Sequence, residues 1–290
     1  MKTNSLVVIA LFMSVLLLGG CSKSSEMEHY AKLVEYWHGR EIKLPEVMTD
    51  ALTGDTIDLS DADFTIFTYM DSTGCTSCKM KLAIWKEFLS AIDTITDSNV
   101  KSIMVVHPKD YRDVMYLLKR DSYTYPVFID KRDSVNTVNE FPDDPVFQSF
   151  LLDKSHRILA IGNPVNLSGV ASLYRSLLSG EKTLSASGTE MVKVDRNIIH
   201  LGSVQLGKTV TADIVLTNVG NDTVHIKKIM PSCDCTTADI PLSSIPPRTN
   251  VKATIKFKED SLKGDFNRSV HIYYEGFDYP SVIQLCGTLK

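Results

Sequence analysis

The chain has 290 residues, of which 43% are hydrophobic and 23% are charged, and its 31 basic and 35 acidic residues give a net charge of −4. This composition is typical of a globular protein with two domains of modest size, and it excludes wholesale disorder, a collagen and a coiled coil. No block of like charge departs from the balance, so the sequence does not indicate a nucleic-acid partner.

The first residues have the pattern of an export signal. Lys2 is followed by an apolar run from Leu6 to Leu18, which is shorter than the roughly 20 residues of a transmembrane helix. Gly19 and Gly20 then precede Cys21. The segment resembles a bacterial lipoprotein signal, and an ordinary signal peptide with a coincidental cysteine is the alternative. The resemblance implies that residues 1–20 are removed, that Cys21 is acylated, and that the chain is lipid-anchored in the cell envelope, facing the periplasm.

The mature chain divides into two regions of different pattern. Residues 21–40 are expected to be a lipidated tether and a short helix, in which Tyr30, Leu33, Val34 and Trp37 have amphipathic spacing. From residue 41 to residue 180, apolar strands alternate with amphipathic helices, which predicts an α/β domain. The predicted strands cover 64–70, 100–106, 127–129, 150–152 and 158–161, and the predicted helices lie near 82–92, 111–119 and 170–178.

A polar stretch separates this domain from the rest of the chain. Residues 181–190 are rich in Ser, Thr and Gly and are predicted to be a flexible linker. Residues 191–290 contain runs with a period of two, such as 210–216, 251–257 and 270–274. This pattern predicts an antiparallel β-sandwich of about a hundred residues.

The motif most indicative of chemistry is Cys75-Thr76-Ser77-Cys78, between the first predicted strand and the helix that follows. A thiol at a helix N-terminus is stabilised as the thiolate by free backbone N–H groups and by the helix dipole. We therefore predict Cys75 as the nucleophile and Cys78 as the resolving thiol, with Lys79 and Lys81 adding positive charge. A structural disulfide or half of a zinc site are the alternatives, but no second ligand pair for zinc lies in this segment.

This region resembles the membrane-anchored, thioredoxin-like proteins of the TlpA type. The resemblance covers residues 41–178 and includes Leu44-Pro45-Glu46 and the run from Phe150 to Lys154. It implies a thioredoxin fold and a dithiol that exchanges disulfides in the envelope. The sequence departs from the family at Gly74, where an aromatic residue is usual, and at Phe147, where a cis-proline is usual.

The second region contains Pro231-Ser232-Cys233-Asp234-Cys235-Thr236. Together with Leu201–Val204, Thr217–Gly220 and Gly264–Phe266, this motif resembles an uncharacterised family of bacterial immunoglobulin-like domains with a Ser-Cys-x-Cys-Thr turn. Cysteines one residue apart suit a metal thiolate site or an exchangeable pair better than a mutual disulfide. A bridge from one of them to Cys286 is the other alternative.

Three further features carry less weight. Gly202–Thr209 fits the phosphate-loop formula, but an alternating strand follows instead of a helix, so nucleotide binding and any other cofactor are not expected. The seven histidines show no metal-binding spacing, and His107 is interpreted as an ordinary strand-end residue. Asp71 is interpreted as a turn residue in preference to a proton relay.

The sequence therefore predicts an α/β thioredoxin-like domain followed by an all-β immunoglobulin-like sandwich. The predicted function is that of a cell-envelope thiol–disulfide oxidoreductase acting on protein thiols and disulfides, with a redox partner in the envelope. The alternative is a non-catalytic lipoprotein in which both folds are a binding platform, an idea favoured by Gly74 and by the missing cis-proline. A ten-residue linker spans roughly 15–20 Å as a flexible coil. That reach predicts thiol exchange between Cys233 or Cys235 and the Cys75 site.

Overall fold

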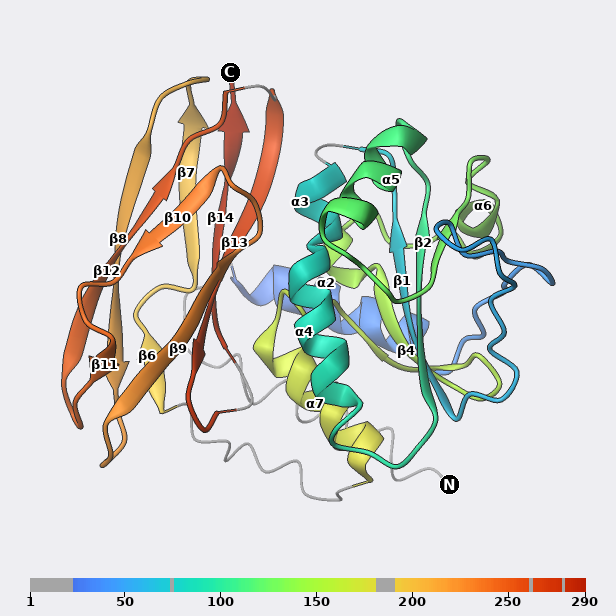
Figure 1. The fold of residues 1–290 in the computed structure, drawn as a ribbon, viewed down its shortest axis with the longest axis horizontal. Coiled ribbons are helices and arrows are strands. Elements are labelled where there is room, and N and C mark those ends of the chain that lie inside the picture. The colour runs from blue at the N-terminus through green and yellow to red at the C-terminus, as the bar shows by residue number, and fades with distance from the viewer. Residues whose placement is uncertain (1–22, 74–75, 181–190, 261–262, 278–279) are drawn as a thin grey trace.

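A computed structural model describes residues 23–73, 76–180, 191–260, 263–277 and 280–290. It shows a mixed α/β chain in which sheets predominate, with an α/β unit followed by a unit built only of strands (Figure 1). The helices of the first unit are α2 (Lys23–Trp37), α3 (Thr76–Met80), α4 (Leu82–Ile92), α5 (Tyr111–Arg120), α6 (Ser134–Asn139), the 3₁₀ turn η1 (Pro145–Phe147) and α7 (Ser168–Ser179).

The first unit contains a five-stranded sheet with β1 at its centre. The order is β3-β2-β1-β4-β5; β1, β2 and β3 are parallel, and β4 and β5 are each antiparallel to their neighbours. The strands are β1 (Phe64–Met70), β2 (Val100–Val106), β3 (Val127–Ile129), β4 (Ser149–Asp153) and β5 (Ile158–Ile161). The predicted positions of these strands are confirmed to within a residue at each end.

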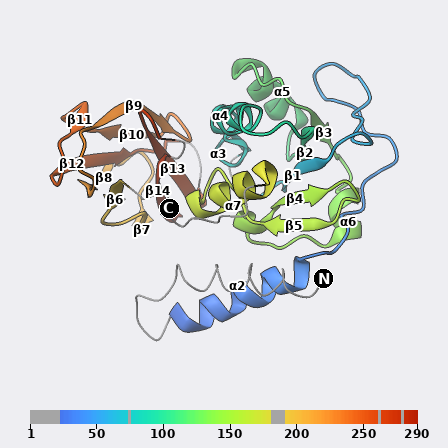
Figure 2. The same ribbon diagram turned by 90° about the horizontal axis from the view of Figure 1, so that it is seen from below.

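Both faces of this sheet are covered, which explains why its strands are apolar throughout. Ile66 and Leu151 pack on one face with α4, α5 and α7. Phe67 and Phe150 pack on the other face, where Trp37 of α2 lies against the Phe150 ring at 5.4 Å between ring centroids. Figure 2 shows α2 below β5, on the side opposite α4.

The second unit consists of two sheets around one core. The four-stranded sheet has the order β10-β12-β8-β6 and the five-stranded sheet has the order β11-β9-β13-β14-β7. The strands are β6 (Val192–Val194), β7 (Ile198–Val204), β8 (Val210–Asn218), β9 (Val224–Pro231), β10 (Thr236–Asp239), β11 (Ser244–Ile245), β12 (Asn250–Phe257), β13 (Gly264–Tyr274) and β14 (Ser281–Leu289). The expectation of purely antiparallel pairing is wrong at one place, because β14 and β7 are parallel.

The outer face of the five-stranded sheet packs against the first unit (Figures 1 and 2). Lys228 on β9 forms an ion pair of 2.6 Å with Glu87 on α4, and Gln284 on β14 donates to the carbonyl oxygen of Asn166 at 3.0 Å. Met230 packs against the core of the first unit. The sequence predicts two units joined by a flexible linker that lets them approach each other, whereas the structure has them packed in direct contact. The linker, residues 181–190, lies outside the described residues.

Candidate functional site

The Cys75–Cys78 motif falls at the carboxyl end of the central strand. β1 ends at Met70, and α3 begins at Thr76 and contains Cys78. Cys75 and the lipidation candidate Cys21 lie outside the described residues, and the side chain of Cys78 is not described. The structure thus describes the segments on either side of the motif, and the roles of its two thiols stay predictions.

Asp71 organises the turn between β1 and α3. Its carboxylate accepts from the Thr73 backbone N–H at 2.6 Å and from the Thr73 hydroxyl at 2.5 Å, and it forms an ion pair with Lys79. Burial opposes ionisation of Asp71, but the hydrogen bonds from Lys79 and Thr73 outweigh it and lower the pKa of this carboxyl. The interpretation as a turn residue accounts for these contacts, and Lys79 is held by Asp71.

Lys81 separates α3 from α4 and is buried. Its backbone is left-handed, with φ 43°, and its carbonyl accepts the first hydrogen bonds of α4 from Ile84 and Trp85. The Nζ atom donates to Asn166 Oδ1 at 2.7 Å and to Ser269 Oγ at 3.0 Å. Burial, with a contribution from Arg268, lowers the pKa of Lys81 to about 7. An amine three residues after Cys78 is therefore held by both units of the protein.

Ser269 connects Lys81 to the second cysteine motif. The backbone N–H of Ser269 donates to Ser232 Oγ at 2.9 Å, and the Ser232 N–H donates to the Ser269 carbonyl at 2.8 Å. Ser269 Oγ also lies 3.1 Å from Nε2 of His271, whose pKa is lowered to about 3 by burial and by Lys81. The resulting network runs from the end of α3 to the residue that precedes Cys233.

Cys233 and Cys235 are joined to each other in a disulfide, with their Cα atoms 5.2 Å apart. The expectation against a mutual disulfide is therefore wrong, and the alternative of a bridge to Cys286 is wrong as well, because Cys286 is a free thiol. Leu285 is buried in the core of the second unit, so the next residue on the strand faces the opposite side. There the Cys286 sulfur lies 3.0 Å from Nδ1 of His200, and burial raises the pKa of the thiol.

The metal-thiolate alternative for Cys233 and Cys235 finds no support in the described ranges, which contain no cluster of three or more His, Cys, Asp or Glu residues able to hold a metal ion. The phosphate-loop formula also lacks its structural context, because Gly202 lies in β7 and β8 follows Thr209. None of the helices in the part of the chain that the structure describes is long and apolar enough to cross a membrane.

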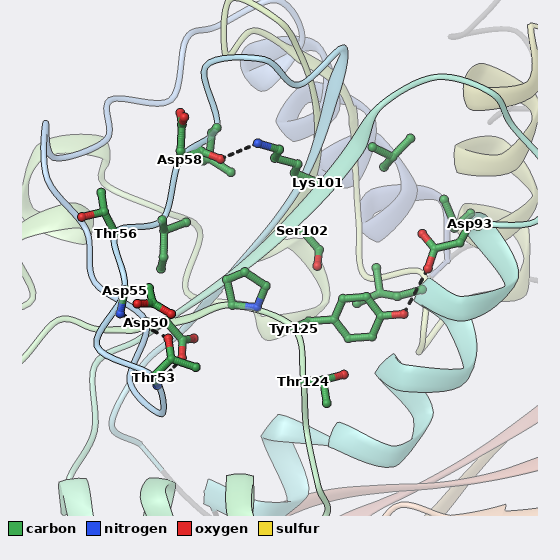
Figure 3. A pocket seen from close by; sticks show the side chains of 16 residues that line it. Asp50, Thr53, Asp55, Thr56, Asp58, Asp93, Lys101, Ser102, Thr124 and Tyr125 are labelled. Carbon is green, nitrogen blue, oxygen red and sulfur yellow. Dashed lines mark hydrogen bonds between the residues drawn. The ribbon is translucent and has the colours of Figure 1, made fainter.

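A separate pocket of about 460 Å³ lies at the amino-terminal end of β2 (Figure 3). Asp50 accepts from the Val127 backbone N–H at 2.9 Å, and the Tyr125 hydroxyl donates to Asp93 at 3.3 Å. Burial and Asp93 raise the pKa of Tyr125 to about 12. Because the cysteine motif follows the opposite end of β1, the pocket is not part of the candidate site.

Comparisons with known proteins cover parts of the chain. Residues 192–289 match a family described as "Protein of unknown function (DUF1573)". No match is found among curated proteins. The family match concerns about a third of the chain and brings no activity with it.

Several solved structures are similar to parts of the chain. The thioredoxin domain of a thiol-disulfide oxidoreductase from Bacteroides vulgatus is 15% identical, covering 49% of this chain and 97% of that one, with a TM-score of 0.38. For peroxidoxin BcpB from Mycobacterium tuberculosis the identity is 12%, the coverage 50% and 97%, and the TM-score 0.38. A protein of unknown function from Porphyromonas gingivalis W83 is 15% identical over 34% of this chain, with a TM-score of 0.30. The match spans 46% of that protein's length. All three TM-scores are below 0.5, so none of these likenesses assigns an activity.

Sequence reasoning missed the buried cations Lys81 and Arg268. Lys81 entered the prediction only as a nearby charge, and Arg268 did not enter it at all. Lys81 has no signal in the sequence, because it is buried by parts of the fold distant in sequence. Arg268 has one, because it stands in the alternation of Phe266, Val270 and Ile272, which are buried like it.

Proposed function

We propose that the protein is a cell-envelope thiol–disulfide oxidoreductase that acts through Cys75 and Cys78 in a thioredoxin-like first unit. The observation that carries the proposal is the sheet: the motif follows the carboxyl end of a central strand that is parallel to β2 and antiparallel to β4, and it leads into α3. An immunoglobulin-like fold for residues 191–290 is part of the same proposal, supported by two sheets around one core.

In the proposed reaction, the Cys75 thiolate attacks one sulfur of a substrate disulfide. A mixed disulfide forms, and the other substrate sulfur leaves as a thiolate that takes up a proton. Cys78 then attacks Cys75, which releases the second substrate thiol and leaves Cys75 and Cys78 oxidised. A redox partner in the envelope reduces the pair again. Lys81, three residues after Cys78, adds a buried amine whose charge favours thiolates nearby when it is protonated.

The first prediction tests the roles of the two thiols. Incubated with a synthetic peptide disulfide, Cys78→Ser is expected to accumulate a mixed disulfide at Cys75, because no resolving thiol remains. Cys75→Ser is expected to accumulate none. Peptide mass spectrometry identifies the adduct, and Cys286→Ser, which removes the free thiol on β14, is the matched control and should behave like the wild type.

Two results would contradict the proposal. Equal trapping by both variants would overturn the assignment of nucleophile and resolving thiol. A reduction potential for the Cys75/Cys78 pair below about −300 mV, measured against glutathione, would make the pair a structural bridge. With no catalytic dithiol, the protein would be a binding platform in which both units serve as a non-catalytic scaffold.

We also propose that Cys21 carries the lipid that anchors the protein to an envelope membrane. The second prediction is that Cys21→Ala releases the protein from the membrane fraction, because the described helices offer no other means of spanning a bilayer. Immunoblotting of carbonate-washed membranes measures the retained fraction, with Cys286→Ser as the control. Retention of Cys21→Ala at the wild-type level would refute the anchor.

A further inference from the structure

The Cys233–Cys235 disulfide lies in a tight turn that connects the two sheets of the second unit. β9 of the five-stranded sheet ends at Pro231, and β10 of the four-stranded sheet begins at Thr236. The Thr236 N–H donates to the Cys233 carbonyl at 3.2 Å, and the Lys258 N–H donates to the Cys235 carbonyl at 2.9 Å. The backbone on both sides of the disulfide is therefore fixed, and both cysteines are only partly buried.

The two sulfurs have different surroundings. The Thr236 hydroxyl contacts both sulfurs, at 3.5 Å from Cys233 Sγ and 3.7 Å from Cys235 Sγ, whereas Arg268 Nε donates to Cys235 Sγ at 3.3 Å. The other arms of the guanidinium are occupied: Nη1 donates to the Asn267 carbonyl at 3.2 Å, and Nη2 lies 3.6 Å from a carboxylate oxygen of Glu259. The Arg268 side chain is 3% exposed. A buried cation is thus aimed at one sulfur of the disulfide.

A buried guanidinium beside a sulfur has a chemical consequence. It stabilises that sulfur as a thiolate, and a thiol with a lowered pKa is the better leaving group when its disulfide is attacked. Burial lowers the pKa of Arg268 itself and Glu259 opposes this, but a guanidinium remains charged over the whole range in which thiols titrate. The arrangement therefore favours departure of Cys235 and directs an incoming thiolate to Cys233.

We propose that Cys233–Cys235 is a second redox centre, which accepts two electrons from a protein dithiol with Cys233 as the attacked sulfur and Cys235 as the leaving thiolate beside Arg268. The donor thiolate forms a bond to Cys233 Sγ as the Cys233–Cys235 bond breaks. The second thiol of the donor then attacks its own partner and releases Cys233. The donor ends as a disulfide, and Cys233 and Cys235 end as thiols after uptake of the two protons that the donor lost.

The donor that the structure favours is the dithiol of the first unit, and this part of the inference rests on the proposed function. Lys81, the residue after α3, donates a hydrogen bond to Ser269. Ser269 is hydrogen-bonded in turn to Ser232, the neighbour of Cys233. Asp234 in the same turn adds to the effect of Asp121 in raising the pKa of Arg120 at the end of α5. The disulfide turn therefore faces the α3–α5 side of the first unit.

The third prediction separates the second centre from the first. In the full chain carrying Cys75→Ser and Cys78→Ser, dithiothreitol reduces Cys233–Cys235, and alkylation followed by peptide mass spectrometry gives the rate. Arg268→Gln is expected to slow this reduction roughly tenfold, since a hydrogen bond to a charged group is lost. The reduction rate of Arg268→Lys should lie between the rate with Arg268 and the rate of Arg268→Gln. Arg248→Gln, at an exposed turn where the arginine contacts Asn221, is the matched control.

Two further measurements guard against a folding defect. The double variant Glu259→Gln/Arg268→Gln removes both members of the buried ion pair and should remain as slow as Arg268→Gln. The alkylation of each thiol is also followed against pH in two reduced variants of the double-serine chain that keep Arg268. The midpoint for Cys235, measured in Cys233→Ser, should be lower than the midpoint for Cys233, measured in Cys235→Ser. The proposal is overturned by a wild-type reduction rate in a folded Arg268→Gln protein or by the opposite order of the two midpoints.

The identity of the donor is tested in the same assay. With Cys75 and Cys78 present and dithiothreitol at about 0.1 mM, reduction of Cys233–Cys235 should be roughly tenfold faster than in the double-serine chain and independent of protein concentration, because a tethered thiol has a millimolar effective concentration. Equal rates in the two chains would show that Cys75 and Cys78 are not the donor. The effect of Arg268→Gln would still test whether Cys233–Cys235 is a redox centre. Failure of the proposed function appears separately, as the absence of a peptide adduct on Cys78→Ser.

Discussion

Two buried cations, Lys81 and Arg268, have different places in the protein: Lys81 contacts both units, whereas the contacts of Arg268 lie within the second unit. Among the described residues, Lys81 has hydroxyl and amide partners but no carboxylate, and Arg268 has a carboxylate and a disulfide sulfur. Burying a charge is costly unless it is paired, so an amine without a counter-ion favours its neutral form. The pKa of about 7 for Lys81 follows from this, with Arg268 contributing in the same direction.

The fourth prediction concerns stability as a function of pH. Unfolding restores the pKa of Lys81 to its ordinary value near 10.5, so between about pH 7 and 10.5 the unfolded chain binds more protons than the folded one. The free energy of unfolding should therefore rise with pH between about 7 and 10.5. Below about pH 7 the folded protein bears the full cost of burying charged Lys81, on the order of a few kcal/mol. The thermal unfolding midpoint at pH 6.5 and pH 9.5 measures the rise.

Lys81→Met should abolish this rise, because the aliphatic volume is kept and the titrating group is gone. Lys256→Met, which removes an exposed lysine on β12, should leave the rise unchanged. Cysteines and tyrosines titrate in the same range, so the difference between Lys81→Met and the wild type is the informative quantity. An identical pH dependence for the two proteins would show that Lys81 is not buried as the structure has it.

At the level of elements, continuous apolar runs predicted the strands of the first unit closely because both faces of its sheet are buried, and amphipathic spacing predicted α4, α5 and α7, whereas the short α6 and η1 were not predicted. The break at Lys81 was not predicted, since nothing in Met80-Lys81-Leu82 breaks a helix, and Lys81 takes its left-handed conformation while its side chain contacts the second unit. The parallel pairing of β14 with β7 was not predicted, because alternation indicates which face of a strand is buried but not the direction of the neighbouring strand. The cysteine motifs were found from spacing alone, whereas the pairing of Cys233 with Cys235 required the geometry of the turn.

At the level of the whole molecule, the contact between the units combines apolar packing, polar links and one ion pair. Met230 packs on the first core, Gln284 bonds to the backbone of Asn166, and Lys228 pairs with Glu87. A cavity of about 180 Å³ remains between the units, with Arg175 from α7 and His271 from β13 among its lining residues. Nδ1 of His271 is buried and has no hydrogen-bond partner in the described part of the chain. The junction places the Cys233–Cys235 turn near Lys81 and α5 of the first unit, a placement that a linker alone would not fix.

The fifth prediction is that this contact persists without a covalent connection. A protease site inserted within residues 181–190 allows the chain to be cut between the units after folding. If the buried contacts of Lys81, Ser269 and Met230 hold the units together, the cut halves should co-elute in size-exclusion chromatography at micromolar concentration. Met230→Glu places an unpaired charge against the first core and should separate the cut halves. Glu87→Gln removes only one partly exposed ion pair and should not separate the halves, because such pairs contribute little to the free energy of association. Separation of the cut wild-type protein would mean that the linker, and not the interface, keeps the two units together.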